Sequence, residues 1–246
     1  MPKLQPTRHN YVKAAVALWL TLVAGSVDVI GYLTLYHAFT AHMTGETVHL
    51  GRDLLQARWR DALTAGVVVA AFLIGSVIGR AIIEIGSRTR VRSIASATLL
   101  IEAALLAAVI PMAGASHKPV LLLLAMLAAA MGTQTATLTR VGALTVHTTF
   151  VTGMLNKLAQ VLSRCAFLSY DVLRGRPALV ERKNAFQQAA FFSGIWILYL
   201  AGAVSGAWMK SVWGVHALAP TAAAVVIVVP VDQFVPLSIE EEKDQS

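Results

Sequence analysis

The sequence predicts an all-α membrane protein: a polytopic helix bundle of about six transmembrane helices, arranged as two inverted three-helix repeats. Composition, the spacing of long apolar runs and an internal repeat together predict this fold. Of the 246 residues, 57% are hydrophobic and only 13% are charged, whereas soluble domains carry about 25% charged residues. The single cysteine, Cys165, and the high apolar content exclude a disulfide-rich secreted scaffold and a disordered chain.

Six stretches approach the roughly 20 apolar residues that cross a bilayer as a helix. They cover residues 14–36, 62–83, 93–114, 119–138, 185–209 and 215–231. The last is short and has Pro220 and Pro230 near its ends, where proline is tolerated. A cleaved signal peptide is the alternative for the first stretch, because Lys3, Arg8 and Lys13 precede it.

The distribution of basic residues predicts the orientation. With the N-terminus inside, fifteen Lys and Arg residues fall on the cytoplasmic side and five on the opposite side. The predicted organisation is a cytoplasmic segment 1–13, a first repeat 14–114, a second repeat 119–231 and an acidic cytoplasmic tail 232–246. The net charge of +7 lies mainly in cytoplasmic connectors, so it does not indicate a nucleic-acid partner. We expect the bacterial inner membrane as the location.

Two internal matches indicate that the chain contains the same unit twice. Residues Thr40, Thr44 and Gly45 recur 108 positions later as Thr148, Thr152 and Gly153. A second match aligns FLIGSVIG at 72–79 with YLAGAVSG at 199–206. Two directly joined blocks of three helices must have opposite orientations, which is the architecture of many secondary transporters. Channels and some membrane enzymes are duplicated as well.

Three ionisable residues lie at or near membrane depth, where a charge costs about 2.5–3.5 kcal/mol on insertion scales. Asp28 lies in the first span, Glu102 in the third, and Arg140 follows the polar end of the fourth. With the 108-residue offset Asp28 corresponds to Ala136, one turn from Arg140, so an Asp28–Arg140 ion pair at comparable depth is expected. Such a pair serves either as a proton or cation coupling site or as a structural clamp. Glu102 is either a proton relay or a buried neutral acid.

The two Thr-x-x-x-Thr-Gly segments are the best candidates for substrate binding. Threonine hydroxyls can point at a ligand, and glycine permits a broken backbone. If each segment enters the membrane as a broken helix, the two meet near the midplane; the alternative is a helix-capping loop at the interface. The predicted substrate-binding residues are Thr40, Thr44, Gly45, Gln134, Thr148, Thr152 and Gly153.

A possible metal site is the competing hypothesis. His42, Glu46 and His49 share one face if they are helical, and His37 offers a fourth ligand. The second half has no similar set at the 108-residue offset. This pattern leaves a metal-dependent membrane enzyme as an alternative, whereas the main hypothesis includes no metal, no cofactor and no catalytic residue.

Several of these motifs resemble a known family. GSVDVIGYL at 25–33 and AHMTGETV at 41–48 resemble the signature of the YoaK family of bacterial membrane proteins, and MGTQ at 131–134 and TTFVTG at 148–153 resemble its second-half motif. The resemblance extends from about residue 11 to 231. It implies a multi-spanning inner-membrane protein but no substrate, because the family is classed as a domain of unknown function. Glu46 and Thr135 replace asparagines common in the family, which allows a different substrate preference.

The function expected from these features is a small secondary transporter or permease for an unidentified small solute, proton-coupled through Asp28. Its partners are the lipid bilayer and that solute, and a homodimer is compatible with so small a chain. A structural or regulatory membrane protein is the third hypothesis, since the longest cytoplasmic segment, 164–184, is only a short basic connector.

Overall fold

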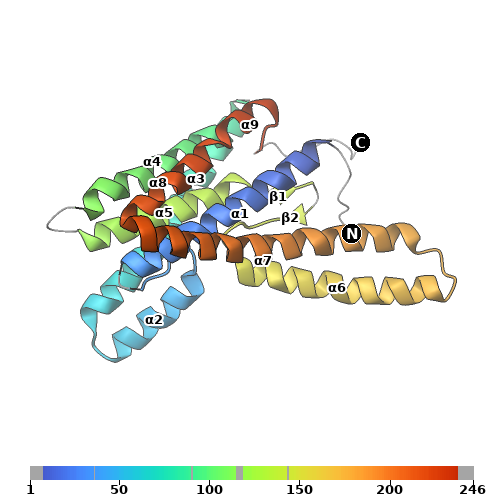
Figure 1. Cartoon of the computed structure of the whole chain (residues 1–246), viewed down its shortest axis with the longest axis horizontal. Coiled ribbons are helices and arrows are strands. Elements are labelled where there is room, and N and C mark those ends of the chain that lie inside the picture. The colour runs from blue at the N-terminus through green and yellow to red at the C-terminus, as the bar shows by residue number, and fades with distance from the viewer. Residues whose placement is uncertain (1–7, 36, 90, 115–118, 143, 238–246) are drawn as a thin grey trace.

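The computed structural model describes residues 8–35, 37–89, 91–114, 119–142 and 144–237, and nearly all of these are helical (Figure 1). The helices are α1 (Arg8–Thr34), α2 (Met43–Leu55), α3 (Trp59–Arg88), α4 (Ala95–Ala113), α5 (Val120–Thr137), α6 (Val151–Leu173), α7 (Leu179–Trp213), the 3-10 helix η1 (Gly214–Ala217), α8 (Leu218–Val226) and α9 (Val229–Phe234). A two-stranded antiparallel hairpin, β1 (Arg140–Val141) and β2 (Leu144–Thr145), follows α5. Most of the predicted segment 1–13 and tail 232–246 lies outside the described residues.

Five helical stretches in the described residues are long and apolar enough to cross a membrane. Four are α1, α3, α4 and α5, and each matches one predicted span to within a few residues. The fifth is the continuous stretch Leu179–Phe234, which contains both the fifth and the sixth predicted spans. This stretch turns back at Gly214, where a positive φ of 61° favours glycine.

Helices α2 and α6 were not among the predicted spans. Each forms a hairpin with the helix that follows it, α2 with α3 and α6 with α7. The two hairpins extend toward opposite ends of the molecule (Figure 1). Because α6 is amphipathic, its apolar side packs on α7 through residues such as Met154 and Cys165, whereas its other side is open.

The centre of the bundle consists of α1 and α5. Within their most apolar windows 67% and 61% of residues are buried, compared with 28% for α3. Helix α1 packs mainly on α7, α5 packs on α3 and α4, and α4 also contacts α8. Asp28, Gln134 and the two Thr-Gly segments lie on the two central helices and on the segments that follow them.

Close backbone contacts join α1 to α7 and α5 to α3. A Cβ on Gly202 would overlap the carbonyl oxygen of Leu22, and a Cβ on Gly75 would overlap that of Ala129. Both glycines therefore let neighbouring backbones touch, which is how membrane helices associate without a hydrophobic driving force. The glycine pairs of the second sequence match thus act at helix packing faces.

Two hydrogen bonds accompany these contacts in matching positions. The Ser26 hydroxyl on α1 donates to the Gly202 carbonyl at 2.9 Å, and the Thr133 hydroxyl on α5 donates to the Gly75 carbonyl at 3.4 Å. Each bond links a central helix to an outer helix from the other half of the chain.

The start of α4 is capped by a residue from the end of the chain. The Asp232 carboxylate accepts hydrogen bonds from the Ser96 backbone N–H at 2.7 Å and the Ser96 hydroxyl at 2.8 Å. A carboxylate at a helix N-terminus satisfies free amides and complements the helix dipole. Asp232 is therefore a buried structural residue, although the sequence analysis placed it in the solvated tail.

Candidate functional site

The candidate site is built around Asp28 on α1, which is only 4% exposed. After α1 ends at Thr34, the described residues 37–42 return along the helix as non-helical backbone before α2 begins. Gly31 allows this return, because a Cβ there would lie 2.8 Å from Thr40 Cγ2. We call residues 37–42 the return segment. It holds four of the groups that contact the Asp28 carboxylate.

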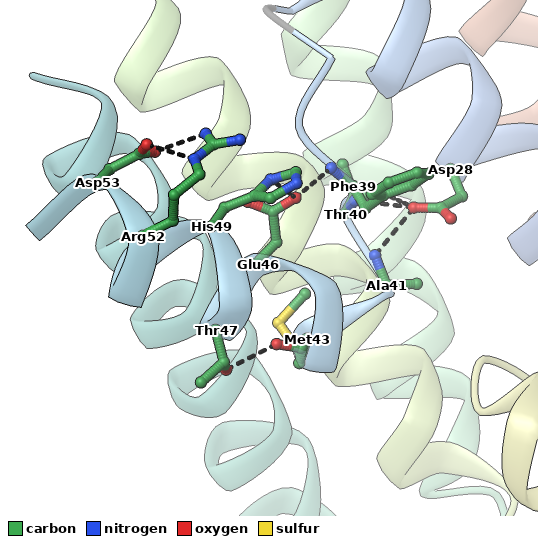
Figure 2. Close-up of polar contacts among 10 residues, drawn as sticks. All are labelled: Asp28, Phe39, Thr40, Ala41, Met43, Glu46, Thr47, His49, Arg52 and Asp53. Atoms are coloured by element: carbon green, nitrogen blue, oxygen red, sulfur yellow. Dashed lines mark hydrogen bonds and ion pairs between the residues drawn. The ribbon is translucent and has the colours of Figure 1, made fainter. Parts of the chain in front are cut away.

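The Asp28 carboxylate holds the return segment through both backbone and side chain (Figure 2). Its Oδ1 accepts hydrogen bonds from the Thr40 N–H at 2.7 Å, the Thr40 hydroxyl at 3.0 Å and the Ala41 N–H at 2.9 Å. Hydrogen bonds to an ionised acceptor are about twice as strong as neutral ones. The charge of Asp28 thus fixes the conformation of the segment.

The other oxygen of Asp28 contacts one more residue of the return segment and a residue of α7. Its Oδ2 accepts a hydrogen bond from the Tyr199 hydroxyl on α7 at 2.8 Å and lies 2.6 Å from His42 Nδ1. His42 is partly exposed whereas Asp28 is buried. One carboxylate therefore joins α1, the return segment and α7.

Glu46 on α2 holds the same segment from its other side (Figure 2). Its Oε1 accepts a hydrogen bond from the Phe39 N–H at 2.8 Å, and His49 Nδ1 lies 3.9 Å from it. Burial raises the pKa of Glu46, whereas the hydrogen bond to Asp28 raises the pKa of His42, with a further contribution from the Glu46 charge. Two carboxylates, those of Asp28 and Glu46, thus hold the return segment, and the segment itself carries a titratable histidine, His42.

Aromatic rings surround this polar cluster. Tyr32 stacks on Phe39 with ring centroids 4.7 Å apart, Phe39 lies 5.2 Å from the His42 ring, and His42 lies 5.9 Å from the Tyr199 ring. These rings cover the cluster with apolar surface, which strengthens the electrostatic interactions beneath it.

The predicted residues of the first Thr-Gly segment divide into two groups. Thr40 is buried and bonded to Asp28, as described above. Thr44, in contrast, is exposed in the first turn of α2, and Gly45 lies beside the Phe39 ring. Only Thr40 of this segment belongs to the Asp28 cluster.

The second segment forms a separate cluster at the end of α5. It consists of Thr135, Thr148 and Thr149, and we call it the Thr148 cluster. The hydroxyls of Thr149 and Thr135 lie 2.6 Å apart. Thr148 is 1% exposed, and its hydroxyl has no hydrogen-bond partner among the described residues. Thr152 is exposed on α6, and the Phe150 ring lies against Gly153.

The two clusters lie at different positions along α1. The side-chain amide of Gln134, next to Thr135, donates to the Leu20 carbonyl of α1 at 2.6 Å. Leu20 precedes Asp28 by eight residues, so Gln134 is offset from Asp28 by about 12 Å along α1 at 1.5 Å per helical residue. The structure therefore does not bring the two Thr-Gly segments together at one site, as was expected from the sequence.

The expected ion pair between Asp28 and Arg140 is not formed. The bonding partners of Asp28 lie in the return segment and on α7, whereas Arg140 is an exposed residue of β1. Glu102 is fully buried on α4, and neither of its carboxyl oxygens has a hydrogen-bond partner within the described ranges. Neither residue contacts the Asp28 carboxylate.

The proposed metal face is also not assembled. His42 turns toward Asp28, whereas Glu46 turns toward the Phe39 amide. Among the described residues no three His, Cys, Asp or Glu side chains are grouped so that they could hold a metal ion. The hypothesis of a metal-dependent enzyme therefore gains no support from the geometry.

Tyr199 is the site residue that sequence reasoning missed. It lies 171 positions from Asp28, and its helix was used in the sequence analysis only as part of the second internal match. One signal was present: the matching position in the first half is Phe72, so this pair of residues differs by a single hydroxyl group. A hydroxyl gained at a matched aromatic position is a reason to look for a hydrogen-bond partner.

Together, five apolar spans and a buried polar cluster define a polytopic membrane protein. Comparison with known protein families identifies the family of this chain. Residues 16–231 match the family described as protein of unknown function (DUF1275). The chain is 30% identical to the UPF0700 transmembrane protein YoaK of Bacillus subtilis (strain 168) over 190 residues, which is 75% of this chain and 78% of that protein. The chain belongs to this family, as its motifs indicated, and no solved structure matches it.

Proposed function

We propose that the chain is a small secondary transporter or permease of the bacterial inner membrane, and not an enzyme. One observation carries the proposal: a buried carboxylate inside a spanning helix holds a non-helical segment of its own half and a helix of the other half. Intramembrane ionisable residues that face the bundle interior typically mark ion or substrate pathways. Asp28 is the coupling residue in this account.

The proposal includes two inverted repeats, supported by the matched contacts. Gly25 lies against the Tyr199 carbonyl exactly as Gly132 lies against that of Phe72. The bonds of Ser26 and Thr133 repeat the same correspondence. These contacts relate α1 to α5 with an offset of 107 residues (Gly25 to Gly132), so Asp28 corresponds to Thr135 rather than Ala136.

The proposal also includes a sixth crossing, made by α8 and α9 together. Contacts pair Leu22 with Gly202 and Ser26 with Gly206, so α1 and α7 run parallel. The chain turns at Gly214, and α8 and α9 then lie against α4. With six crossings both termini share one side, which the excess of basic residues assigns to the cytoplasm.

A proton on Asp28 would switch the site. Neutralising the carboxylate replaces its charge-assisted hydrogen bonds with weaker ones, so the return segment and α7 are held less firmly. His42 Nδ1, 2.6 Å from Oδ2, is positioned to pass that proton from the partly exposed side. Binding or release of one proton thereby changes how one half of the bundle is joined to the other.

The first prediction concerns transport by an Asp28→Asn variant. Purified protein in proteoliposomes is tested for uptake of a panel of small organic acids, amino acids and sugars, with and without a pH gradient. We expect wild type to accumulate at least one solute when the gradient is imposed, and Asp28→Asn to lose the acceleration by the gradient, because it cannot bind or release the proton.

Asp232→Asn is the matched control. It neutralises another buried carboxylate, which accepts hydrogen bonds from Ser96 at the start of α4 and from the Leu237 N–H and is not part of the Asp28 site, so it is expected to keep gradient-driven uptake in proportion to folded protein. Equal gradient dependence in wild type and Asp28→Asn would remove Asp28 from the mechanism. Absence of uptake for the whole panel would favour a non-transporting regulatory protein.

A further inference from the structure

We propose that the Thr148 cluster is a binding site for a small carboxylate. This inference deepens the proposed function, since it rests on the inverted repeat and names the class of substrate. The structure itself offers a template for the ligand, because the first half places a carboxylate, that of Asp28, in the corresponding position.

The argument begins with three donors of the first half. The N–H groups of Thr40 and Ala41 and the hydroxyl of Thr40 converge on one oxygen, Asp28 Oδ1. Their counterparts at the 108-residue offset are the N–H groups of Thr148 and Thr149 and the hydroxyl of Thr148. The second half therefore repeats the donors of the first.

The acceptor is not repeated. Asp28 corresponds to Thr135, whose shorter side chain donates to the Met131 carbonyl or contacts the Thr149 hydroxyl. In the described part of the chain the Thr148 hydroxyl has no hydrogen-bond partner, and neither the Thr148 nor the Thr149 N–H forms a hydrogen bond. Both residues are buried.

Buried donors without an acceptor are costly, about 1–3 kcal/mol each, and rare in native structures. Three of them in the arrangement that binds a carboxylate in the first half form a site for an acidic oxygen. Glu46, the second carboxylate of the first half, is also replaced by an apolar residue, Met154, at the same offset. The second cluster has thus lost both of its acids and kept their donors.

The local charge also favours an anion. Lys157 replaces His49 at the same offset, and its ammonium donates to the Thr145 carbonyl just before the cluster. The positive charge of Lys157 acts on the residues just before Thr148. The pKa of His147 is lowered mainly by burial and, to a smaller extent, by the charge of Lys157. The Asp28 cluster carries two acids, whereas the Thr148 cluster is neutral to basic.

The test measures equilibrium binding to the purified full-length chain. Sodium acetate is titrated at constant ionic strength, and the thermal unfolding midpoint is followed, with chloride and phosphate as competing probes. We expect a saturable rise with acetate and weaker responses to the other two. Thr148→Val, which removes the unpaired hydroxyl, should weaken acetate affinity about tenfold, as expected for a hydrogen bond to a charged group.

Three further variants test the assignment. Thr21→Val removes a buried hydroxyl that is bonded within its own helix, so it should leave acetate affinity unchanged. Thr135→Asp supplies the missing carboxylate, so it should abolish the acetate response and raise the midpoint in its absence, whereas Thr135→Val should keep the response.

No saturable acetate response in wild type, or equal affinities in Thr148→Val and Thr21→Val, would overturn the proposal. A response to chloride or phosphate as strong as that to acetate would overturn the carboxylate assignment. Since no flux is measured, the two proposals fail separately: acetate binding without uptake of any solute contradicts only the transporter, and uptake without acetate binding contradicts only this site.

Discussion

At the scale of single residues, Asp28 and its five hydrogen-bonding contacts explain how a charge can be kept inside the bundle. A buried carboxylate is tolerated when donors replace the water that it has lost. Backbone amides, two hydroxyls and an imidazole supply those donors here. Glu102 on α4, which lacks donors in the described residues, shows the opposite case.

The second prediction concerns His42 and pH. Since the bond to Asp28 raises the pKa of His42 above its usual 6.5, the folded state holds this proton more tightly than the unfolded state does. The stabilisation is fully present below about pH 6.5 and is lost as pH rises through the raised folded value. The difference in unfolding midpoint between wild type and His42→Gln should therefore be largest at acidic pH and shrink above neutrality.

The control for this series is His49→Gln, which removes a histidine from α2 that is 3.9 Å from Glu46 and not bonded to Asp28. The midpoints of all three proteins are measured in detergent across the same buffers. A His42→Gln difference that grows with increasing pH would contradict the proposed contact with Asp28.

At the scale of helices, the paired contacts of α1 with α7 and of α3 with α5 depend on glycine. The third prediction compares two substitutions on α3. Gly75→Ala places a methyl group against the Ala129 backbone, so the helices must separate, at a cost of about 1–3 kcal/mol. Gly66→Ala has only the Leu50 side chain 3.9 Å away and should be neutral or stabilising by up to about 1 kcal/mol.

Thermal unfolding of the two variants in detergent measures this difference, since both carry the same added methyl group on the same helix. Equal midpoints for Gly75→Ala and Gly66→Ala would mean that α3 and α5 do not touch at Gly75.

The helices that could be predicted from the sequence are those whose long apolar composition is sufficient to indicate a membrane span. Long apolar runs placed α1, α3, α4 and α5 to within a few residues, because lipid requires such lengths. Helices α2 and α6 were not predicted. Helix α2 is short and α6 is amphipathic, so neither has the long apolar run that is typical of a transmembrane helix. Their existence depends on packing against α3 and α7.

The candidate site was predictable only in part. Asp28 and Thr40 were identified, since a charge in a span and a repeated threonine are visible in the sequence. Their mutual bond was not, because the path of the return segment depends on Gly31 admitting Thr40. The pairing with Arg140 is not formed because Asp28 is bonded to the segment that follows its own helix and to Tyr199, whereas Arg140 lies in β1 after the end of α5.

At the scale of the whole molecule, the inverted repeat that we propose gives the two halves opposite orientations, with the Asp28 cluster in one half and the Thr148 cluster in the other. The Asp28 cluster carries the titratable groups, and the Thr148 cluster carries donors without acids. A proton and a carboxylate would then bind to different halves, with α1 and α7 joining them through Asp28 and Tyr199.

The most direct test of this account is the sidedness of α2 and α6. Single cysteines replace Val48 and Asn156, exposed residues at corresponding positions of the two helices, in a Cys165→Ala background, and intact cells are treated with a membrane-impermeant maleimide. The inverted repeat predicts labelling at position 48 in intact cells and at position 156 only after permeabilisation. Labelling of both positions from the same side would contradict it.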